Sequence, residues 1–276
     1  MPTTTNDGIS LYYEDSGPSD AEPVVLVEGL ATGRWMWRRQ RDALEDEYRV
    51  IVPDNRGTGR SDAPEGPYTI QEMTADLEAI LADADVDHAH VVGASMGGMI
   101  AQRYALDYDR TATLGLLCTT HGGPDALPIP EETQAQMFAA PEGADERERI
   151  KHRMRPAVSD SLYEEKPELV EQIVDWRLEQ NADEAAREAQ AAGVLNFDTS
   201  DELDELTVPT LICHGQKDRV VPVENAHLLH EKLPESRLEI LDDGHHLFFF
   251  EDAEWVTERL HEFLRSNPIA TPAEES

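Results

Sequence analysis

The sequence of 276 residues has few basic side chains and very little lysine. Four lysines, Lys151, Lys166, Lys217 and Lys232, occur beside 57 acidic residues, and the formal net charge is −34. Nucleic acids and anionic membrane surfaces bind proteins through clusters of lysine and arginine. The charge therefore predicts that neither nucleic acid nor a membrane is a partner of this chain.

Cysteine and long apolar runs are scarce as well. The two cysteines, Cys118 and Cys213, each lie in an apolar stretch, so we expect buried free thiols in a reducing compartment and no disulfide framework. No apolar stretch approaches the roughly 18 residues of a membrane-spanning helix. Residues 1–10 lack the basic and apolar segments of a secretory signal. These absences predict a cytoplasmic protein.

Acidic residues are spread along the whole chain. Self-repulsion of this size destabilises a folded protein in dilute buffer, whereas about 1 M salt shortens the Debye length to about 3 Å and screens the charges. The composition resembles that of proteins from extreme halophiles, which implies a cytoplasm of molar salt. An ordinary acidic protein from a mesophile is the alternative.

Short apolar runs alternate with longer amphipathic segments along most of the chain. This alternation predicts an α/β fold, with a parallel sheet covered by helices on both faces. We expect strands at residues 8–15, 24–27, 49–53, 89–92, 114–118, 208–213 and 238–241. We expect helices at residues 35–47, 68–84, from Gly98 to about 108, 223–232 and 252–264.

The alternation stops between residues 121 and 200, where glutamate, alanine, arginine and glutamine recur at helical spacing. We therefore expect residues 1–120 and 201–265 to form one α/β core. Residues 121–200 would form a helical insertion in this core. Residues 266–276 are polar and contain two prolines, which predicts a flexible tail.

The segment Gly93-Ala94-Ser95-Met96-Gly97 lies between a predicted strand and a predicted helix. A serine on a sharp strand-to-helix turn has strained backbone angles, needs small neighbours, and projects its hydroxyl where the helix N-terminus favours negative charge. Ser95 is therefore a candidate nucleophile. The alternative is an ordinary turn with a helix-capping serine.

A serine nucleophile needs a base, and the base needs an acid that fixes its tautomer. Asp218 follows the strand expected at 208–213, and the pair His245-His246 follows the strand expected at 238–241. These side chains lie beyond the carboxyl ends of predicted strands, where open α/β sheets place their sites. The chain thus offers a nucleophile, an acid and a base in the order serine, aspartate, histidine.

Together with the loop Asp54-Asn55-Arg56-Gly57-Thr58-Gly59-Arg60-Ser61, these motifs resemble those of the α/β-hydrolase family over about residues 8–264. The resemblance implies a mostly parallel sheet covered by helices on both faces, with the helical segment 121–200 inserted as a cap after the sixth strand. The stretch from Ser95 to Gln102 is similar to that of small esterases and enol-lactonases.

The resemblance also implies catalytic roles. The family places its base directly after a glycine near the last strand, which favours His245 as the base, with Ser95 as nucleophile and Asp218 as acid. His246 is the alternative base; otherwise it is a neighbour that packs under the cap and lines the substrate pocket. Asp125, after the sixth strand, is the alternative acid.

By family position, the backbone N–H groups of Leu30 and Met96 would hold the oxyanion of a tetrahedral intermediate. The family usually has histidine where this chain has Glu28. Glu28 is either a surface acid tolerated in an acidic background or a carboxylate near the oxyanion loop, where it would disfavour anionic substrates. His121 stands at a strand end facing the cap, where it is either a turn residue or a substrate contact.

These roles imply a serine hydrolase that forms an acyl-enzyme and needs no cofactor or metal. A short-chain carboxylesterase acting on small neutral esters is the first interpretation. The alternative is a lactonase such as 3-oxoadipate enol-lactonase, whose anionic substrate would need a cation such as Arg34 or Arg38. A ligand-binding relative without turnover is the alternative from another class, and cofactor-free haloperoxidase activity would use the same triad.

Overall fold

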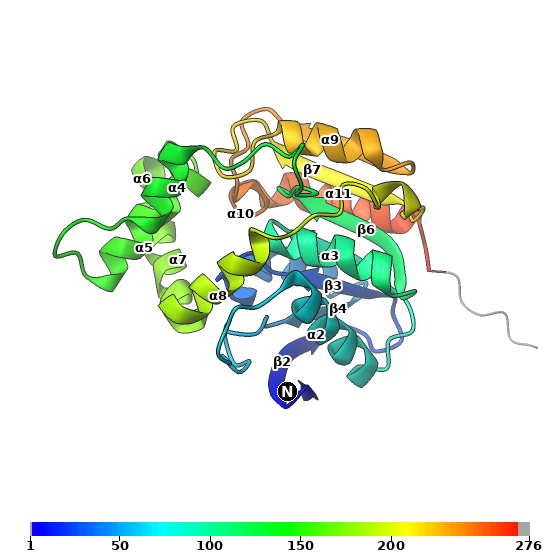
Figure 1. Ribbon diagram of the computed structural model, residues 1–276. Helices are drawn as coiled ribbons and strands as arrows, with labels where there is room; N and C mark the ends of the chain where they lie inside the picture. Colours follow the sequence, from blue (N-terminus) through cyan, green and yellow to red (C-terminus); the bar gives the residue numbers. More distant parts are fainter. Residues whose placement is uncertain (1, 270–276) are drawn as a thin grey trace, which may run out of the picture.

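The computed structural model describes residues 2–269, and an eight-stranded sheet forms its centre (Figure 1). The strand order is β1-β2-β4-β3-β5-β6-β7-β8. The strands are β1 Thr3–Asn6, β2 Ile9–Ser16, β3 Pro23–Val27, β4 Arg49–Pro53, β5 Ala89–Ala94, β6 Thr111–Leu117, β7 Thr210–Gly215 and β8 Ser236–Leu241. β2 pairs antiparallel with both β1 and β4, and all other neighbours pair parallel, which confirms the predicted mostly parallel sheet.

The central strands are apolar along their whole length because both of their faces are covered. In β3, Val24 and Leu26 belong to one buried cluster, while Val25 and Val27 belong to another. Successive side chains of a strand point to opposite faces. The two clusters are therefore the hydrophobic cores on the two sides of the sheet.

Helices cover both faces of the sheet (Figure 1). α1 and α11 pack against one face, and α2, α3 and α9 pack against the other. The elements are η1 Arg34–Trp37, α1 Arg38–Leu44, α2 Ile70–Asp83, α3 Met96–Asp107, α9 Glu224–Lys232, α10 Phe248–Glu251 and α11 Ala253–Ser266. The helix expected at 35–47 is thus divided into a short 3-10 turn and a shorter α-helix.

A helical cap follows the sixth strand, as the sequence analysis expected, and extends to one side of the sheet (Figure 1). Its elements are α4 Glu131–Phe138, α5 Glu146–Met154, η2 Arg155–Ala157, α6 Asp160–Glu165, α7 Pro167–Gln180 and α8 Glu184–Val194. Side chains of Asp145, Ser159 and Asp183 accept N–H groups at the starts of α5, α6 and α8, as helix caps do. Of the tail predicted at 266–276, residues 270–276 lie outside the described residues.

The two cysteines lie side by side on neighbouring strands, Cys118 directly after β6 and Cys213 within β7. The backbone N–H of Cys118 donates to the carbonyl oxygen of Cys213 at 3.0 Å, which joins the ends of β6 and β7. Both thiols are buried and free, as the sequence analysis expected.

Candidate active site

Ser95 occupies a strained turn between β5 and α3. Its backbone angles are φ 56° and ψ −120°, a combination that L-residues rarely adopt. Its N–H donates to the carbonyl oxygen of Leu117 in β6 at 2.9 Å, which fixes the turn against the sheet. Backbone strain of this kind persists only where the surroundings enforce it, and it collects at functional sites.

Two glycines allow the chain to make this turn. A Cβ at Gly93 would lie 2.1 Å from the carbonyl oxygen of Gly97, and a Cβ at Gly97 would lie 2.1 Å from that of Val27. Neither position has room for a side chain. The small neighbours expected around Ser95 are therefore required by the packing of the turn against β3.

Asp218 and His246 form a buried hydrogen-bonded pair beyond the ends of β7 and β8. Oδ2 of Asp218 lies 2.7 Å from Nδ1 of His246. Oδ1 of Asp218 accepts the N–H groups of Val220 at 2.7 Å and Val221 at 2.9 Å. An ionised carboxylate only accepts, so Nδ1 of His246 carries the proton of this bond and leaves Nε2 free as an acceptor.

A second histidine, His214, contacts the same carboxylate from the end of β7. Its Nε2 lies 3.3 Å from Oδ2 of Asp218 and 2.9 Å from the carbonyl oxygen of Val221. Burial alone would raise the pKa of Asp218, but the interactions with His246 and His214 outweigh burial and hold this pKa well below its usual value. The site therefore keeps Asp218 ionised.

The structure corrects the choice between the two adjacent histidines. The sequence analysis favoured His245 as the partner of Asp218, but His246 makes this contact. His245 instead lines a shallow surface pocket beside Asp243 and Asp252. His246 is 7% exposed, so it is the buried member of the pair.

The turn before the pair explains which histidine faces inward. The carbonyl oxygen of Gly244 accepts the N–H of Lys217 at 2.8 Å. A Cβ at Gly215 would lie 2.4 Å from the same oxygen, so the two loops pack backbone against backbone. Gly244 is thus fixed against the loop that carries Asp218. From this fixed point, the side chain of His246 points toward Asp218. The run from Leu247 to Phe250 is buried throughout, but a continuous apolar run does not show which of the two histidines before it faces inward.

The predicted oxyanion donors lie beside the serine turn. Met96 is the first residue of α3, and N–H groups in the first turn of a helix have no acceptor within that helix. Gly29, which precedes Leu30, packs so close to Ser95 that a Cβ on Gly29 would lie 3.5 Å from the serine Cβ. The segments that carry Leu30 and Met96 therefore meet at Ser95.

Glu28 is not the surface acid that one interpretation of the sequence made it, because its side chain is 0% exposed. Its Oε1 accepts the N–H of Asn55 at 2.9 Å and the hydroxyl of Thr58 at 2.7 Å, so the carboxyl group faces the loop after β4. Burial, reinforced by the negative charge of Asp54, raises the pKa of Glu28 well above its usual value of 4.5. No hydrogen bond joins Glu28 to His246 among the residues that the structure describes.

Other candidates from the sequence lie apart from the Asp218–His246 pair. His121 is buried, and its Nδ1 lies 2.6 Å from the carbonyl oxygen of Gly122, as a turn residue would. Asp125 is exposed and has no contact with either histidine of the pair within residues 2–269. The alternative acid is therefore not placed to act.

The arginines named for an anionic substrate are engaged elsewhere. Arg34 forms ion pairs with Asp54 and, at 3.2 Å, with Glu14. The guanidinium of Arg38 lies over the ring of Trp176, 5.0 Å from its centroid. The cap brings two further side chains against the core, Arg177 over Trp35 and Gln190 beside Ala31. The sequence analysis named neither, because contacts between the cap and the core leave no local pattern.

No group of three or more His, Cys, Asp or Glu side chains among residues 2–269 is arranged to hold a metal ion. No helix in the same range has the length and apolar character needed to cross a membrane.

A family model for the alpha/beta hydrolase fold matches residues 22–253. The match covers well over half of the sequence, so the chain belongs to the α/β-hydrolase family, as the motifs in the sequence suggested. The protein is a hydrolase of this superfamily.

Similar proteins have several activities. A thermophilic esterase from Thermogutta terrifontis is 33% identical, with a TM-score of 0.79 and coverage of 96% of each chain. The enol-lactonase from Burkholderia xenovorans LB400 is 26% identical, with a TM-score of 0.83 and coverage of 96% of this chain and 100% of that chain. The non-heme chloroperoxidase of Burkholderia pyrrocinia is 28% identical, with coverage of 84% of this chain and 88% of its own.

Proposed function

We propose that this protein is a serine hydrolase that cleaves carboxylic esters through an acyl-enzyme. Ser95 attacks the ester carbonyl carbon, and Nε2 of His246 takes the hydroxyl proton and returns it to the leaving alcohol. Asp218 holds His246 in the tautomer that leaves Nε2 free. The observation that carries the proposal is the buried hydrogen bond of 2.7 Å between Asp218 and His246.

The remaining steps use backbone groups and water. The N–H groups of Leu30 and Met96 stabilise the negative oxygen of each tetrahedral intermediate. Water, deprotonated by His246, then attacks the acyl carbon and releases the acid and free Ser95. Small neutral esters are the first choice of substrate, because the net charge of −34 disfavours the approach of anions.

A fluorophosphonate probe tests this mechanism directly, because it forms a covalent bond only with an activated serine. The probe is added to wild type and to three variants in about 2 M KCl, which screens the acidic surface, and labelling is followed by intact mass. We expect wild type and His245→Ala to label and Ser95→Ala to remain unlabelled. The labelling rate of His246→Ala should be about a thousandfold lower than that of wild type, or lower still. His245→Ala is the matched control because it removes the adjacent surface histidine.

Two outcomes would contradict the proposal. If His245→Ala loses labelling and His246→Ala keeps it, His245 is the general base. A folded wild type that does not label would point to a protein that binds small ligands without turnover.

A lactonase that acts on an anionic lactone is the second candidate, and the side chain of Arg177 in α7 favours it. Its guanidinium lies over the ring of Trp35, 5.0 Å from the centroid, where the cap meets η1. Its Nε is buried and has no hydrogen-bond partner within residues 2–269. Burial lowers the pKa of Arg177 to about 10, and the nearby guanidinium of Arg187 adds to this effect. Arg177 as a whole is half-buried, and no ion pair joins it to a carboxylate within residues 2–269, so a substrate anion would supply a partner that the protein does not.

The choice between the two substrates is tested by kinetics on an anionic enol-lactone and a neutral short-chain ester. If Arg177 binds a substrate carboxylate, Arg177→Gln raises KM for the lactone by about tenfold or more, because a charged hydrogen bond is lost. KM for the ester should not change. Equal effects on both substrates would remove Arg177 from substrate recognition and favour the neutral ester.

A further inference from the structure

The turn that carries Leu30 has a strained backbone. The N–H of Thr32 donates to the carbonyl oxygen of Gly29 at 3.3 Å, and Ala31 has φ +57°. A four-residue turn closed in this way, with positive φ at its third residue, is of type II and favours glycine at that place. Alanine is strained there because its Cβ crowds a carbonyl oxygen. Other contacts must therefore hold this form of the turn.

The cap binds both polar backbone groups of Ala31. The N–H of Ala31 donates to Oε1 of Gln190 at 2.6 Å, and its carbonyl oxygen accepts the N–H of Ala182 at 3.2 Å. Type I and type II turns differ by a flip of the peptide between their second and third residues. The Ala31 N–H belongs to that peptide, so the contact with Gln190 selects the type II form.

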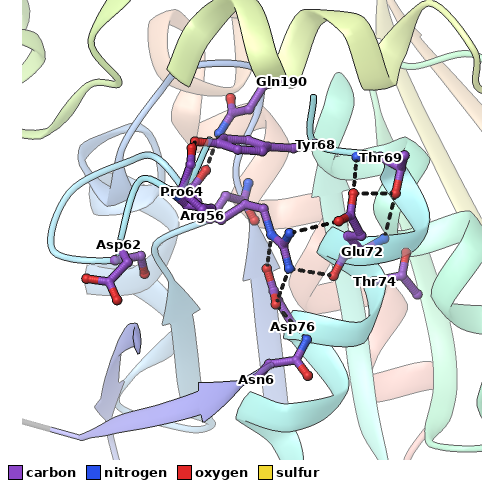
Figure 2. Close-up of polar contacts among 12 residues, drawn as sticks. Asn6, Arg56, Asp62, Pro64, Tyr68, Thr69, Glu72, Thr74, Asp76 and Gln190 are labelled. Carbon is purple, nitrogen blue, oxygen red and sulfur yellow. Dashed lines mark hydrogen bonds and ion pairs between the residues drawn. The ribbon is translucent and has the colours of Figure 1, made fainter. Parts of the chain in front are cut away.

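Gln190 is itself held in place (Figure 2). Its side chain is fully buried, and Nε2 donates to the carbonyl oxygen of Arg56 at 2.9 Å. The guanidinium of Arg56 is fixed by two hydrogen bonds to Asp76 of α2, at 2.6 and 2.8 Å. Both ends of the Gln190 amide are thus satisfied, which fixes which atom faces Ala31.

Helix α8 packs on the core without spare room at this point. The carbonyl oxygen of Ala189 accepts the N–H of Tyr68 at 3.0 Å. A Cβ at Gly193 would lie 2.1 Å from the carbonyl oxygen of Tyr68. Figure 2 shows α8 lying across Tyr68, with Gln190 pointing from the helix toward Arg56. The position of Gln190 therefore reports whether α8 is docked.

We propose that Gln190 is a positioning residue that holds the strained Gly29–Thr32 turn in its type II form and so keeps Leu30, the residue that carries the proposed oxyanion donor, in place. When α8 is docked, the strained turn presents this donor to the oxyanion. When the contact is lost, the peptide between Leu30 and Ala31 flips toward the form that alanine favours. The flip turns over the Leu30 carbonyl and the Ala31 N–H, and the Leu30 N–H is displaced because the backbone of the turn that carries it relaxes. Docking of the cap is thereby coupled to the reaction at Ser95. The inference rests on the proposed function.

Three variants test the coupling. Gln190→Met keeps the length of the side chain and removes both hydrogen bonds. Gln40→Met is the matched control, because Gln40 is also fully buried and donates to a backbone oxygen, that of Phe249, at 2.6 Å. The double variant Gln190→Met with Ala31→Gly lets the turn adopt positive φ without strain.

We expect Gln190→Met to lower kcat on a short-chain ester by about tenfold, less than the loss of a complete oxyanion donor, with KM nearly unchanged. The double variant should recover most of kcat, and Gln40→Met should keep it. Two results would overturn the proposal: a loss of kcat in Gln190→Met that Ala31→Gly does not relieve, or an equal loss of kcat in Gln40→Met. Either result would show that Gln190 only supports the fold.

Amide hydrogen exchange keeps this test separate from the test of the mechanism. Exchange in a peptide spanning residues 28–33 should be faster in Gln190→Met than in wild type and unchanged in Gln40→Met. This comparison needs no catalytic activity, so it still decides whether Gln190 holds the turn if wild type proves inactive toward esters. Equal exchange rates in wild type and Gln190→Met would show that Gln190 does not hold the turn, even if the protein hydrolyses esters.

Discussion

Glu28 and Asp54 are two buried carboxyl groups next to the turn that carries Leu30. Each has one oxygen, Oε2 of Glu28 and Oδ1 of Asp54, that is buried and has no hydrogen-bond partner among the described residues. Arg34 pairs with Asp54, so the positive charge in this region is directed to that carboxylate. Two adjacent buried carboxylates with one cation favour a proton on one of them. Burial raises the pKa of both groups, but the adjacent Arg34 offsets this effect at Asp54, so we expect the proton on Glu28.

Replacing Glu28 by glutamine should therefore change how stability depends on pH. The folded-state pKa of Glu28 is raised, so its contribution to stability is complete below its usual value of 4.5 and is lost as pH rises through the folded-state value. In that window wild type should lose up to about 1.4 kcal/mol of unfolding free energy per pH unit that Glu28→Gln does not lose. Urea unfolding at a series of pH values in constant KCl measures the difference.

The control for this comparison is Glu65→Gln, which changes an exposed carboxylate and leaves the buried network intact. It should follow wild type at every pH. If Glu28→Gln also follows wild type, Glu28 is ionised in the folded protein, and Arg34 must neutralise both carboxylates.

At the residue scale, the sequence analysis identified Ser95, Asp218 and the histidine pair as candidates. It favoured His245 for the contact with Asp218, whereas His246 makes this contact. The serine could be found because its motif combines small residues with a strand and a helix on either side. The choice between His245 and His246 depends on how Gly244 packs against Gly215, a contact between distant segments. No periodicity in the sequence records such a contact.

At the scale of elements, the buried strands were predicted well because continuous apolar runs mark strands that are covered on both faces. The strand expected at 49–53 has these bounds in the structure. β1 was missed because its residues, Thr3–Asn6, are polar and partly exposed, and its only partner in the sheet is β2. Edge strands of this kind have no apolar pattern to find.

The cap shows the limit of sequence patterns at this scale. The composition predicted that the cap is helical. It did not predict which of the cap helices contact the core near the site. Gln190 contacts Ala31, and Arg177 lies over Trp35, in both cases across a large separation in sequence. Each contact depends on how a whole helix docks on the core, and amphipathic spacing gives only the face of a helix that is buried.

At the scale of the whole molecule, negative charge far exceeds what ion pairs can neutralise. Arginines do pair with acids across the surface, as Arg147 does with Glu171 at 2.7 Å and Asp175 at 2.6 Å. Even if every basic side chain were paired, the formal net charge of −34 would remain. Exposed pairs of this kind contribute little to stability, so repulsion among the remaining acids is the dominant electrostatic effect on the fold.

We therefore propose that the fold requires salt, and we expect the melting temperature to rise steeply as KCl increases from about 0.1 M to about 1 M, where the Debye length shortens from about 10 Å to about 3 Å. Screening acts on charge alone, so sucrose at equal concentration, which stabilises proteins by exclusion from their surface, should have a much smaller effect over the same range. Differential scanning calorimetry in the two solutes makes the comparison. A protein that melts at the same temperature in about 0.1 M and about 1 M KCl would contradict both the argument from repulsion and the inference of a molar-salt cytoplasm.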